Sequence, residues 1–316
     1  MDQQPLHEIE RAWRAMNTDV VAIVNAPPGL VAAGERALSE VEQLFHDVEA
    51  ALSRFRETSE LSALNRAAGA PFNATPLLIG VVEAALEAAR VTDGAFDPTI
   101  LGVLVAAGYD RSFEQLVEPG PEPASTAATS RWSWRDVQID HVAGTIELPA
   151  GCGLDLGGIG KGWTVDRAAE RLAPFGSFAV DAGGDMSAGD SDRDGGPWTV
   201  GVENPLDPGQ DLLELAVRDR AVATSTVARR RWQQAGAARH HLIDPRTGQP
   251  SDSGVLSVTV VADSVARAEV LAKAALILGP EDGRRLLDAQ PDVEGLLVLE
   301  NGSRIVSRGF ARYVAS

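Results

Sequence analysis

The stretch Leu154–Asp166, with the sequence LDLGGIGKGWTVD, is the most informative part of the chain. Its glycines Gly157, Gly158 and Gly160 predict a tight turn, with an apolar strand before it and an amphipathic helix after it. Glycines let a backbone approach a ligand closely, the first turn of a helix offers free N–H groups to phosphate, and Lys161 adds a positive charge. The stretch is neither a Walker A sequence nor the dinucleotide fingerprint. Two interpretations therefore remain open: a phosphate-binding turn and an ordinary strand-to-helix connection.

Two further stretches downstream carry glycines and aspartates in a recognisable order. They are Phe178–Gly189, FAVDAGGDMSAG, and His240–Pro250, HHLIDPRTGQP. Together with Leu154–Asp166 they resemble the ApbE family, the FAD:protein FMN transferases, which carries an LDLGGIAKG-like segment, a GGD segment and an H-x-I-D-P-x-T-G segment in that order. The resemblance covers roughly Met16 to Gly279. It implies a single domain of the α+β class with an ApbE-like fold, related to the T-fold, and a flavin-binding cleft. We expect this domain to occupy residues 10–316.

The composition is that of a soluble globular protein with a large core, since 44% of the 316 residues are hydrophobic and 23% are charged. The formal net charge of −17 argues against nucleic acid and anionic lipid as general partners, because like charges repel. A site for FAD, itself an anion, must therefore be a local positive or metal-assisted patch. Cys152 is the only cysteine, which excludes a disulfide within the chain, and we expect a small buried side chain there.

The N-terminal residues MDQQPLHEIERAW lack the basic and apolar regions of a signal peptide. No apolar run reaches ~18 residues, so the sequence predicts no membrane span. The sequence also lacks the N-terminal lipid-anchor cysteine of many ApbE relatives. These features predict a cytoplasmic protein without membrane insertion.

Hydrophobic periodicity predicts a mixture of strands and amphipathic helices, which is typical of the α+β class. A segment rich in Pro, Glu, Ala, Ser and Thr predicts a surface loop at 111–130 rather than a linker between two cores. The expected helices are Gly34–Leu52, Pro76–Val91, Ser264–Leu278 and Glu281–Gln290. The expected strands are Arg11–Val24, 132–139, 145–148, 179–181, 198–202, 212–217, 221–223, 255–261, 295–299 and 304–307.

The resemblance implies that several parts of the chain contact FAD. Its A-M-G-T segment corresponds to Ala15–Thr18, which places Met16 against the flavin and puts Asn17 where the family has glycine. Phe55, just upstream of the S-E-L-S-x-L-N segment Ser59–Asn65, is the candidate aromatic at the adenine end. Without the resemblance, the methionine would be interpreted as a core residue and the serine as a helix cap.

The segment Gly94–Thr99, GAFDPT, matches the family's G-A-F-D-P-T, which contacts the flavin, although a proline-containing turn is the simpler interpretation. The cofactor-binding residues that the resemblance implies are Met16, Phe55, Ala95, Phe96, Asp97, Asp155, Lys161 and Ile243. Asp181 and Asp185 are further carboxylates near the GGD segment, with no role assigned to them.

Moving FMN from FAD to a hydroxyl group is a phosphoryl transfer. It requires neutralisation of the pyrophosphate charge, a positioned acceptor and a path for AMP to leave. His241 matches the family histidine before I-D-P and is the candidate base for the acceptor hydroxyl, with Lys161 and Asp155 as its catalytic partners. The alternative is a structural histidine bonded to the turn.

A divalent cation such as Mg²⁺ prefers oxygen ligands. The resemblance implies a metal site formed by a backbone carbonyl at Gly158 and by an aspartate and a threonine one helical turn apart. Those two positions hold Glu269 and Lys273 here. Glu269 remains able to bind the metal, whereas a protonated Lys273 does not and can instead replace it as the counter-charge. The alternative is an ordinary exposed Glu–Lys pair on a helix.

Three functions follow from these motifs. The first is an FAD:protein FMN transferase that attaches FMN through a phosphoester bond to a Thr or Ser of an acceptor flavoprotein and releases AMP. Intact Asp155, Lys161 and His241 favour it. The second is an FAD-binding protein with lost or altered transferase activity, which the change at Glu269 and Lys273 favours. The third is an FAD pyrophosphatase that yields FMN and AMP.

Overall fold

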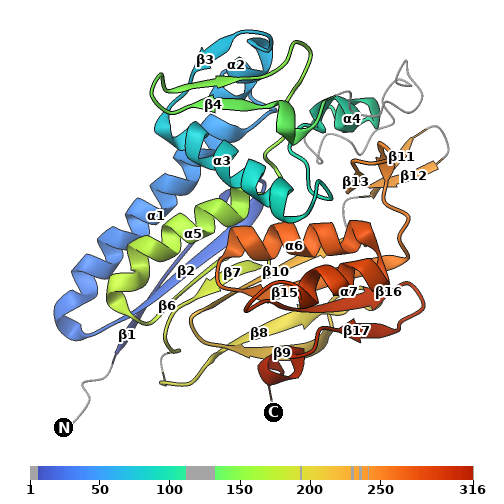
Figure 1. Cartoon of the computed structure of the whole chain (residues 1–316). Helices are drawn as coiled ribbons and strands as arrows, with labels where there is room; N and C mark the ends of the chain where they lie inside the picture. The colour runs from blue at the N-terminus through green and yellow to red at the C-terminus, as the bar shows by residue number, and fades with distance from the viewer. Residues whose placement is uncertain are drawn as a thin grey trace.

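An eight-stranded antiparallel sheet runs through the molecule, with the first strand at one edge and the last at the other (Figure 1). The computed structural model describes residues 6–111, 132–192, 194–228, 231–234, 237–240 and 242–315. The order of the strands across the sheet is β1-β2-β6-β7-β10-β15-β16-β17. Their bounds are β1 His7–Ala15, β2 Thr18–Ala26, β6 Phe178–Ala182, β7 Asp185–Ala188, β10 Arg220–Thr226, β15 Val255–Ala262, β16 Glu294–Leu299 and β17 Arg304–Val306.

Four helices cover one face of this sheet (Figure 1). They are α1 Val31–Leu52, α5 Gly160–Leu172, α6 Val265–Leu278 and α7 Pro280–Asp288. Helix α6 is buried on nearly every side because it lies between α5, α7 and the sheet. Ser264 caps its start by accepting a hydrogen bond from the N–H of Arg267, and Gly279 ends it with a positive φ of +89°.

The opposite face of the sheet is covered by a hairpin of β8 Trp198–Glu203 and β9 Asp211–Val217, together with the short 3₁₀ helix η5 Phe310–Tyr313. Covering both faces explains why β15 is buried at all of its positions. Its Val258 and Val260 pack toward α6, whereas Val261 packs with the β8–β9 hairpin. Side chains that alternate between two covered faces give a strand that is apolar throughout.

A smaller layer lies above the sheet and the helices (Figure 1). It contains a three-stranded sheet in the order β3-β5-β4, and its apolar core includes Leu61, Leu78, Leu148 and Leu154. The elements of this layer are α2 Glu60–Arg66, β3 Pro71–Asn73, α3 Pro76–Val91, α4 Leu101–Ala106, η3 Trp134–Asp136, β4 Gln138–Asp140 and β5 Thr145–Glu147. The glycine stretch therefore leaves this layer and enters α5, at the junction of the two parts of the fold.

The remaining elements are short: η1 Pro28–Leu30, η4 Ala173–Phe175, β11 Arg231–Gln234, β12 Ala237–His240, β13 Ile243–Asp244 and β14 Gln249–Pro250. Within the ranges that the structure describes, no helix is both long enough and apolar enough to cross a membrane. The predicted surface loop at 111–130 lies outside the described residues except for Arg111.

Most predicted elements are confirmed, but three are wrong. The single strand expected over Arg11–Val24 is instead a hairpin, because Met16 and Asn17 both adopt positive φ and turn the chain back. No strand forms over Leu154–Leu156, where the backbone bonds to a side chain and a loop rather than to another strand. The strand expected over 132–139 begins with the 3₁₀ turn η3, which Ser133 caps.

Candidate functional site

One cavity of about 520 Å³ lies where the glycine stretch, the β1–β2 turn, the end of α1 and helix α6 meet. A volume of this size is typical of sites for cofactor-sized ligands. Ten of the residues singled out in the sequence line it: Met16, Phe55, Ala95, Phe96, Asp97, Asp155, Gly158, Lys161, Ile243 and Lys273. They come from six separate parts of the chain, which the fold brings together.

The β1–β2 turn contributes Met16 and Asn17 to the cavity wall. These are the two central residues of a two-residue hairpin loop, with φ of +51° and +61°. A type I′ turn requires positive φ at both central positions, and asparagine tolerates that conformation better than most residues. Asn17 therefore keeps the turn where the family has glycine.

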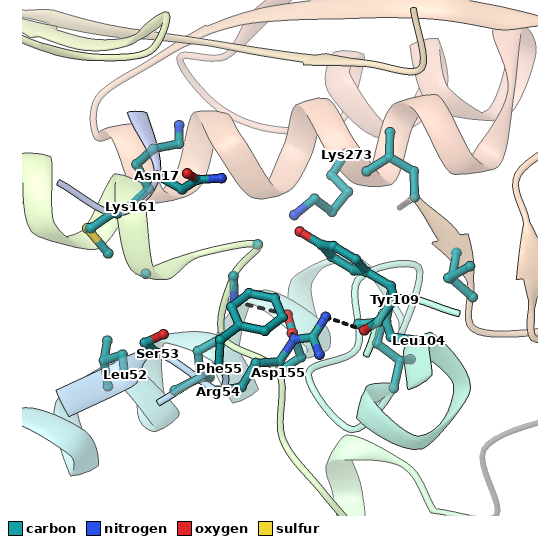
Figure 2. Close-up of a pocket in the computed structure, with 18 of the residues that line it drawn as sticks. Asn17, Leu52, Ser53, Arg54, Phe55, Leu104, Tyr109, Asp155, Lys161 and Lys273 are labelled. Carbon is teal, nitrogen blue, oxygen red and sulfur yellow. Dashed lines mark hydrogen bonds and ion pairs between the residues drawn. The ribbon is translucent and has the colours of Figure 1, made fainter. Parts of the chain in front are cut away.

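Arg54 fixes one wall of the cavity and was not singled out in the sequence. Its Nε lies 2.5 Å from Asp155 Oδ2, and its Nη2 donates a hydrogen bond to the carbonyl oxygen of Tyr109 at 2.8 Å. Its guanidinium lies over the rings of Phe55 and Tyr109, at 4.2 Å and 4.6 Å from their centroids (Figure 2). The result is a wall with two fixed aromatic rings. The sequence contains one indication of this role, because Phe55 has an arginine on each side in a chain that is strongly acidic.

Asn65 holds the start of the glycine stretch in place. Its Oδ1 accepts a hydrogen bond from the N–H of Leu154 at 2.8 Å, and its Nδ2 donates to the carbonyl oxygen of Leu154 at 2.9 Å. Asp155 then receives a hydrogen bond from the N–H of Gly157 at 3.0 Å. The S-E-L-S-x-L-N segment therefore supports the cavity through its last residue, while Ser59 caps α2 as predicted.

Asp97 lies at the side of the cavity and is 8% exposed. It accepts hydrogen bonds from the N–H and hydroxyl of Thr99, at 2.9 and 2.7 Å, and from the N–H of Trp134 at 3.3 Å. Burial raises the pKa of Asp97 above its ordinary value despite these bonds. The GAFDPT segment is thus both a proline-containing turn and part of the cavity wall.

Lys161 projects from the first turn of α5 into the cavity and forms an ion pair with Asp185. Asp185 is 3% exposed and also accepts a hydrogen bond from the N–H of Thr224 at 3.2 Å. Asp181, nearby, accepts a hydrogen bond from the N–H of Gly184 at 3.1 Å, and burial raises its pKa. Asp185 thus holds the lysine, and Asp181 is near enough for the charge of Lys161 to act on it.

A carboxylate in the second turn of each of α5 and α6 caps the first turn of the other helix. The N–H of Gly162 donates to Glu269 Oε2 at 2.9 Å, while Asp166 accepts hydrogen bonds from the N–H groups of Val265 and Ala266 at 2.7 and 3.0 Å. Burial raises the pKa of Asp166 to about 6. The Glu269 side chain, predicted as a metal ligand, does not line the cavity and belongs to a residue that is 6% exposed.

Lys273 reaches the cavity from the middle of α6 (Figure 2). Its Nζ lies against the backbone of Gly158, so close that a Cβ added there would collide with it. The same Nζ is 5.7 Å from the centroid of the Phe96 ring. The ammonium group therefore occupies the space beside the predicted carbonyl ligand.

The H-x-I-D-P segment closes the cavity with Leu242, Ile243 and Pro245. Asp244 is 8% exposed and accepts hydrogen bonds from the backbone N–H and the guanidinium of Arg246. Burial alone would raise the pKa of Asp244, but the Arg246 bonds outweigh it and lower the pKa. His241, the candidate base, lies outside the described residues.

The fold and the cavity define an α+β protein whose cavity is lined by cationic side chains and aromatic rings. A family model for the ApbE family matches residues 16–297, and the chain belongs to that family. A relative from Treponema pallidum, named FAD:protein FMN transferase, is 35% identical over 280 residues, which cover 83% of this chain and 76% of the relative.

Two solved structures are similar along almost the whole chain. The ApbE protein of Thermotoga maritima has a TM-score of 0.87 and 26% identity, and the match covers 98% of this chain and 100% of that one. The flavin transferase ApbE of Vibrio cholerae has a TM-score of 0.82 and 25% identity, with the same coverage. The predicted α+β, ApbE-like fold is confirmed.

Proposed function

We propose that the protein is an FAD:protein FMN transferase. In this reaction an acceptor Thr or Ser hydroxyl oxygen attacks the phosphorus of the FMN half of FAD. A new phosphoester bond forms, the pyrophosphate P–O bond breaks, AMP leaves, and a base takes the hydroxyl proton. The observation that carries the proposal is the convergence of Met16, Phe55, Asp97, Asp155 and Lys161 on one cavity.

The chain's own residues supply positioning and charge in this proposal. Phe55 and Tyr109 offer ring faces for a flat ring system, and Arg54 holds them in place. Lys161, held by Asp185, supplies positive charge for the pyrophosphate. His241 takes the acceptor proton, a role that typically contributes ~10²–10⁴-fold.

Magnesium was expected from the resemblance, but the residues at the implied position do not fit a divalent cation. Glu269 faces the N–H of Gly162 rather than the cavity, and the ammonium of Lys273 lies beside Gly158. Among the described residues, no three His, Cys, Asp or Glu side chains are grouped closely enough to hold a metal ion. The proposal therefore routes no step through a metal bound at these residues.

The partner in this proposal is a flavoprotein that carries a Thr or Ser flavinylation motif, in the cytoplasm. Mass spectrometry of a candidate acceptor after incubation with FAD tests it. We expect the acceptor to gain the mass of FMN less one water, with one AMP released per modified chain. His241→Ala should bind FAD nearly as well as the unmodified protein and transfer ~10²–10⁴-fold more slowly.

The two other functions give different products in the same assay. An FAD pyrophosphatase releases AMP and free FMN without an acceptor. An FAD-binding protein without activity binds FAD and releases no AMP. The observation that favours this last function is that the predicted metal ligand Glu269 does not line the cavity, while the Lys273 ammonium lies beside Gly158.

A further inference from the structure

The two lysines of the chain lie in the same cavity. Of the 28 Lys and Arg residues, 26 are arginines, and the two lysines are Lys161 and Lys273. Both line the cavity. A lysine carries a compact, strongly hydrated point charge, whereas an arginine carries a planar fork suited to bidentate pairing. The chain therefore uses arginine for nearly all of its cationic side chains, and both of its lysine side chains lie in the cavity where a ligand would bind.

The two ammonium groups reach the cavity from different helices. Lys161 is the second residue of α5 and is held by the buried carboxylate of Asp185. Lys273 lies on α6, partly buried, with its Nζ against Gly158 and above the ring of Phe96. Gly157, Gly158 and Gly160 line the cavity next to both, and the absence of side chains at these three glycines leaves backbone open to a ligand.

The carboxylate one helical turn before Lys273 does not form a metal site beside it. Glu269, one helical turn earlier on α6, has its carboxylate on the N–H of Gly162 at 2.9 Å, and so satisfies the start of α5. A divalent cation beside the Lys273 ammonium would be repelled, most strongly where water is excluded. The position therefore favours an anion over a cation.

We propose that Lys161 and Lys273 together bind the pyrophosphate of FAD, with Lys273 supplying the positive charge that a divalent cation would otherwise bring to this ligand. The inference rests on the proposed function for the identity of the ligand. In phosphoryl transfer the charge of the pyrophosphate must be neutralised while AMP leaves, and an ammonium group meets this need without a metal. FAD binding and turnover then proceed in the presence of EDTA.

The first test measures FAD affinity by calorimetry in EDTA and in Mg²⁺. We expect equal affinity in the two buffers for the unmodified protein. Lys273→Met should weaken FAD binding by about 10–100-fold, as expected for the loss of a charge-assisted contact, and Mg²⁺ should not restore it. Arg308→Met, at a side chain that is 86% exposed and outside the cavity, is the matched control and should change nothing.

The second test observes the ammonium groups themselves. Reductive methylation with ¹³C-formaldehyde keeps the positive charge and labels only Lys161, Lys273 and the N-terminal amine. Lys161→Arg and Lys273→Arg assign the two lysine signals. We expect both to shift on addition of FAD or inorganic pyrophosphate in EDTA, and neither to respond to Mg²⁺ alone.

Three results would overturn the inference. One is FAD affinity that requires Mg²⁺ and is unaffected by Lys273→Met. Another is a saturable response of the Lys273 signal to Mg²⁺ alone, and the third is a Lys273 signal that ignores FAD while the Lys161 signal shifts. In each of these FAD still binds, so the proposed function stands. If the unmodified protein binds no FAD in either buffer, the proposed function fails and this inference fails with it.

Discussion

Asn17 shows how one residue sets the shape of the cavity. It follows Met16 in a turn where both residues have positive φ, a conformation that costs most L-residues about 1–2 kcal/mol. Asparagine tolerates it, and glycine tolerates it without cost. Asn17 is therefore compatible with this turn, although the A-M-G-T segment that Ala15–Thr18 resembles has glycine at that position.

We predict that Asn17→Ala lowers the free energy of unfolding by about 1 kcal/mol, because alanine lacks the side chain that makes this conformation tolerable. Asn17→Gly, as the matched control, should stay within about 0.5 kcal/mol of the unmodified protein. Urea denaturation followed by circular dichroism measures both. An alanine variant as stable as the glycine variant would contradict the turn assignment.

At the scale of elements, the reciprocal capping of α5 and α6 controls how the helices meet. Gly162 makes it possible, since a Cβ there would lie 2.8 Å from the backbone nitrogen of Ala266 and 2.9 Å from Glu269 Oε2. Such contacts force one helix away from the other. Because Lys161 and Lys273 lie on these helices, the spacing of the two ammonium groups depends on this glycine.

We predict that Gly162→Ala destabilises the protein by about 1–3 kcal/mol, the usual cost of overpacking, although alanine is the better helix former. Gly80→Ala in α3 is the control, because its Cβ would meet only Trp163, at an ordinary 3.8 Å. That variant should gain about 0.5–1 kcal/mol. Midpoints of urea denaturation measure the difference, and equal midpoints for the two variants would exclude the close approach as the cause.

A pH dependence follows from Asp166, the other half of the capping pair. Its folded pKa of about 6 lies above the ordinary value of 3.8, so the folded state binds more protons between these two values. The contribution of Asp166 to the free energy of unfolding is therefore fully present below about pH 4. It is lost as the pH rises through about 6, and the loss is at most about 3 kcal/mol. The amide side chain in the Asp166→Asn variant does not titrate, so this variant lacks the pH-dependent contribution.

We therefore predict that the stability advantage of the unmodified protein over Asp166→Asn shrinks between about pH 4 and about pH 7. Denaturant unfolding of both proteins across this range measures it. A difference that is constant with pH would show that Asp166 titrates in the folded state as it does in the unfolded chain.

The sequence predicted the elements well where periodicity was long, as in Pro76–Val91 and Ser264–Leu278. It failed at Leu154–Leu156, because a short Leu-Asp-Leu segment looks the same whether its backbone bonds to a strand or, as here, to the Asn65 side chain far away in the chain. It missed Arg54 and Tyr109 for the same reason. Their roles arise from contacts between distant segments, and the two arginines beside Phe55 do not by themselves reveal those contacts.

At the scale of the whole molecule, a strongly acidic protein contains a locally cationic cavity. The net charge is −17, whereas the cavity is lined by five cationic residues and three acidic ones, namely Arg14, Arg54, Arg56, Lys161 and Lys273 against Glu49, Asp97 and Asp155. An anionic ligand is therefore repelled at long range and attracted at contact. Salt screens exposed charges more than partly buried ones.

We predict that the association rate constant of FAD rises when ionic strength increases from about 0.01 M to about 0.15 M, as the Debye length shortens from about 30 Å to about 8 Å. Stopped-flow measurements of flavin fluorescence follow the rate, and uncharged riboflavin is the control that should show little salt dependence. A steep fall in the FAD rate with salt would mean that the field of the cavity dominates at long range.

The mutual capping of α5 and α6 also bears on how the chain folds as it is synthesised. The N–H of Gly162 bonds to Glu269, which is synthesised 107 residues later. The first N–H groups of α6 bond to Asp166, which lies about 100 residues earlier in the chain. At about 5–20 residues per second, a ribosome needs roughly 5–20 s to make the intervening chain. Strands β1, β2, β6 and β7 can pair during this interval, leaving the edge of β7 open until β10 emerges. A nascent chain arrested between β7 and β10 should therefore have a partial sheet with an exposed β7 edge and no completed cavity, and this edge is where a holdase chaperone would be needed.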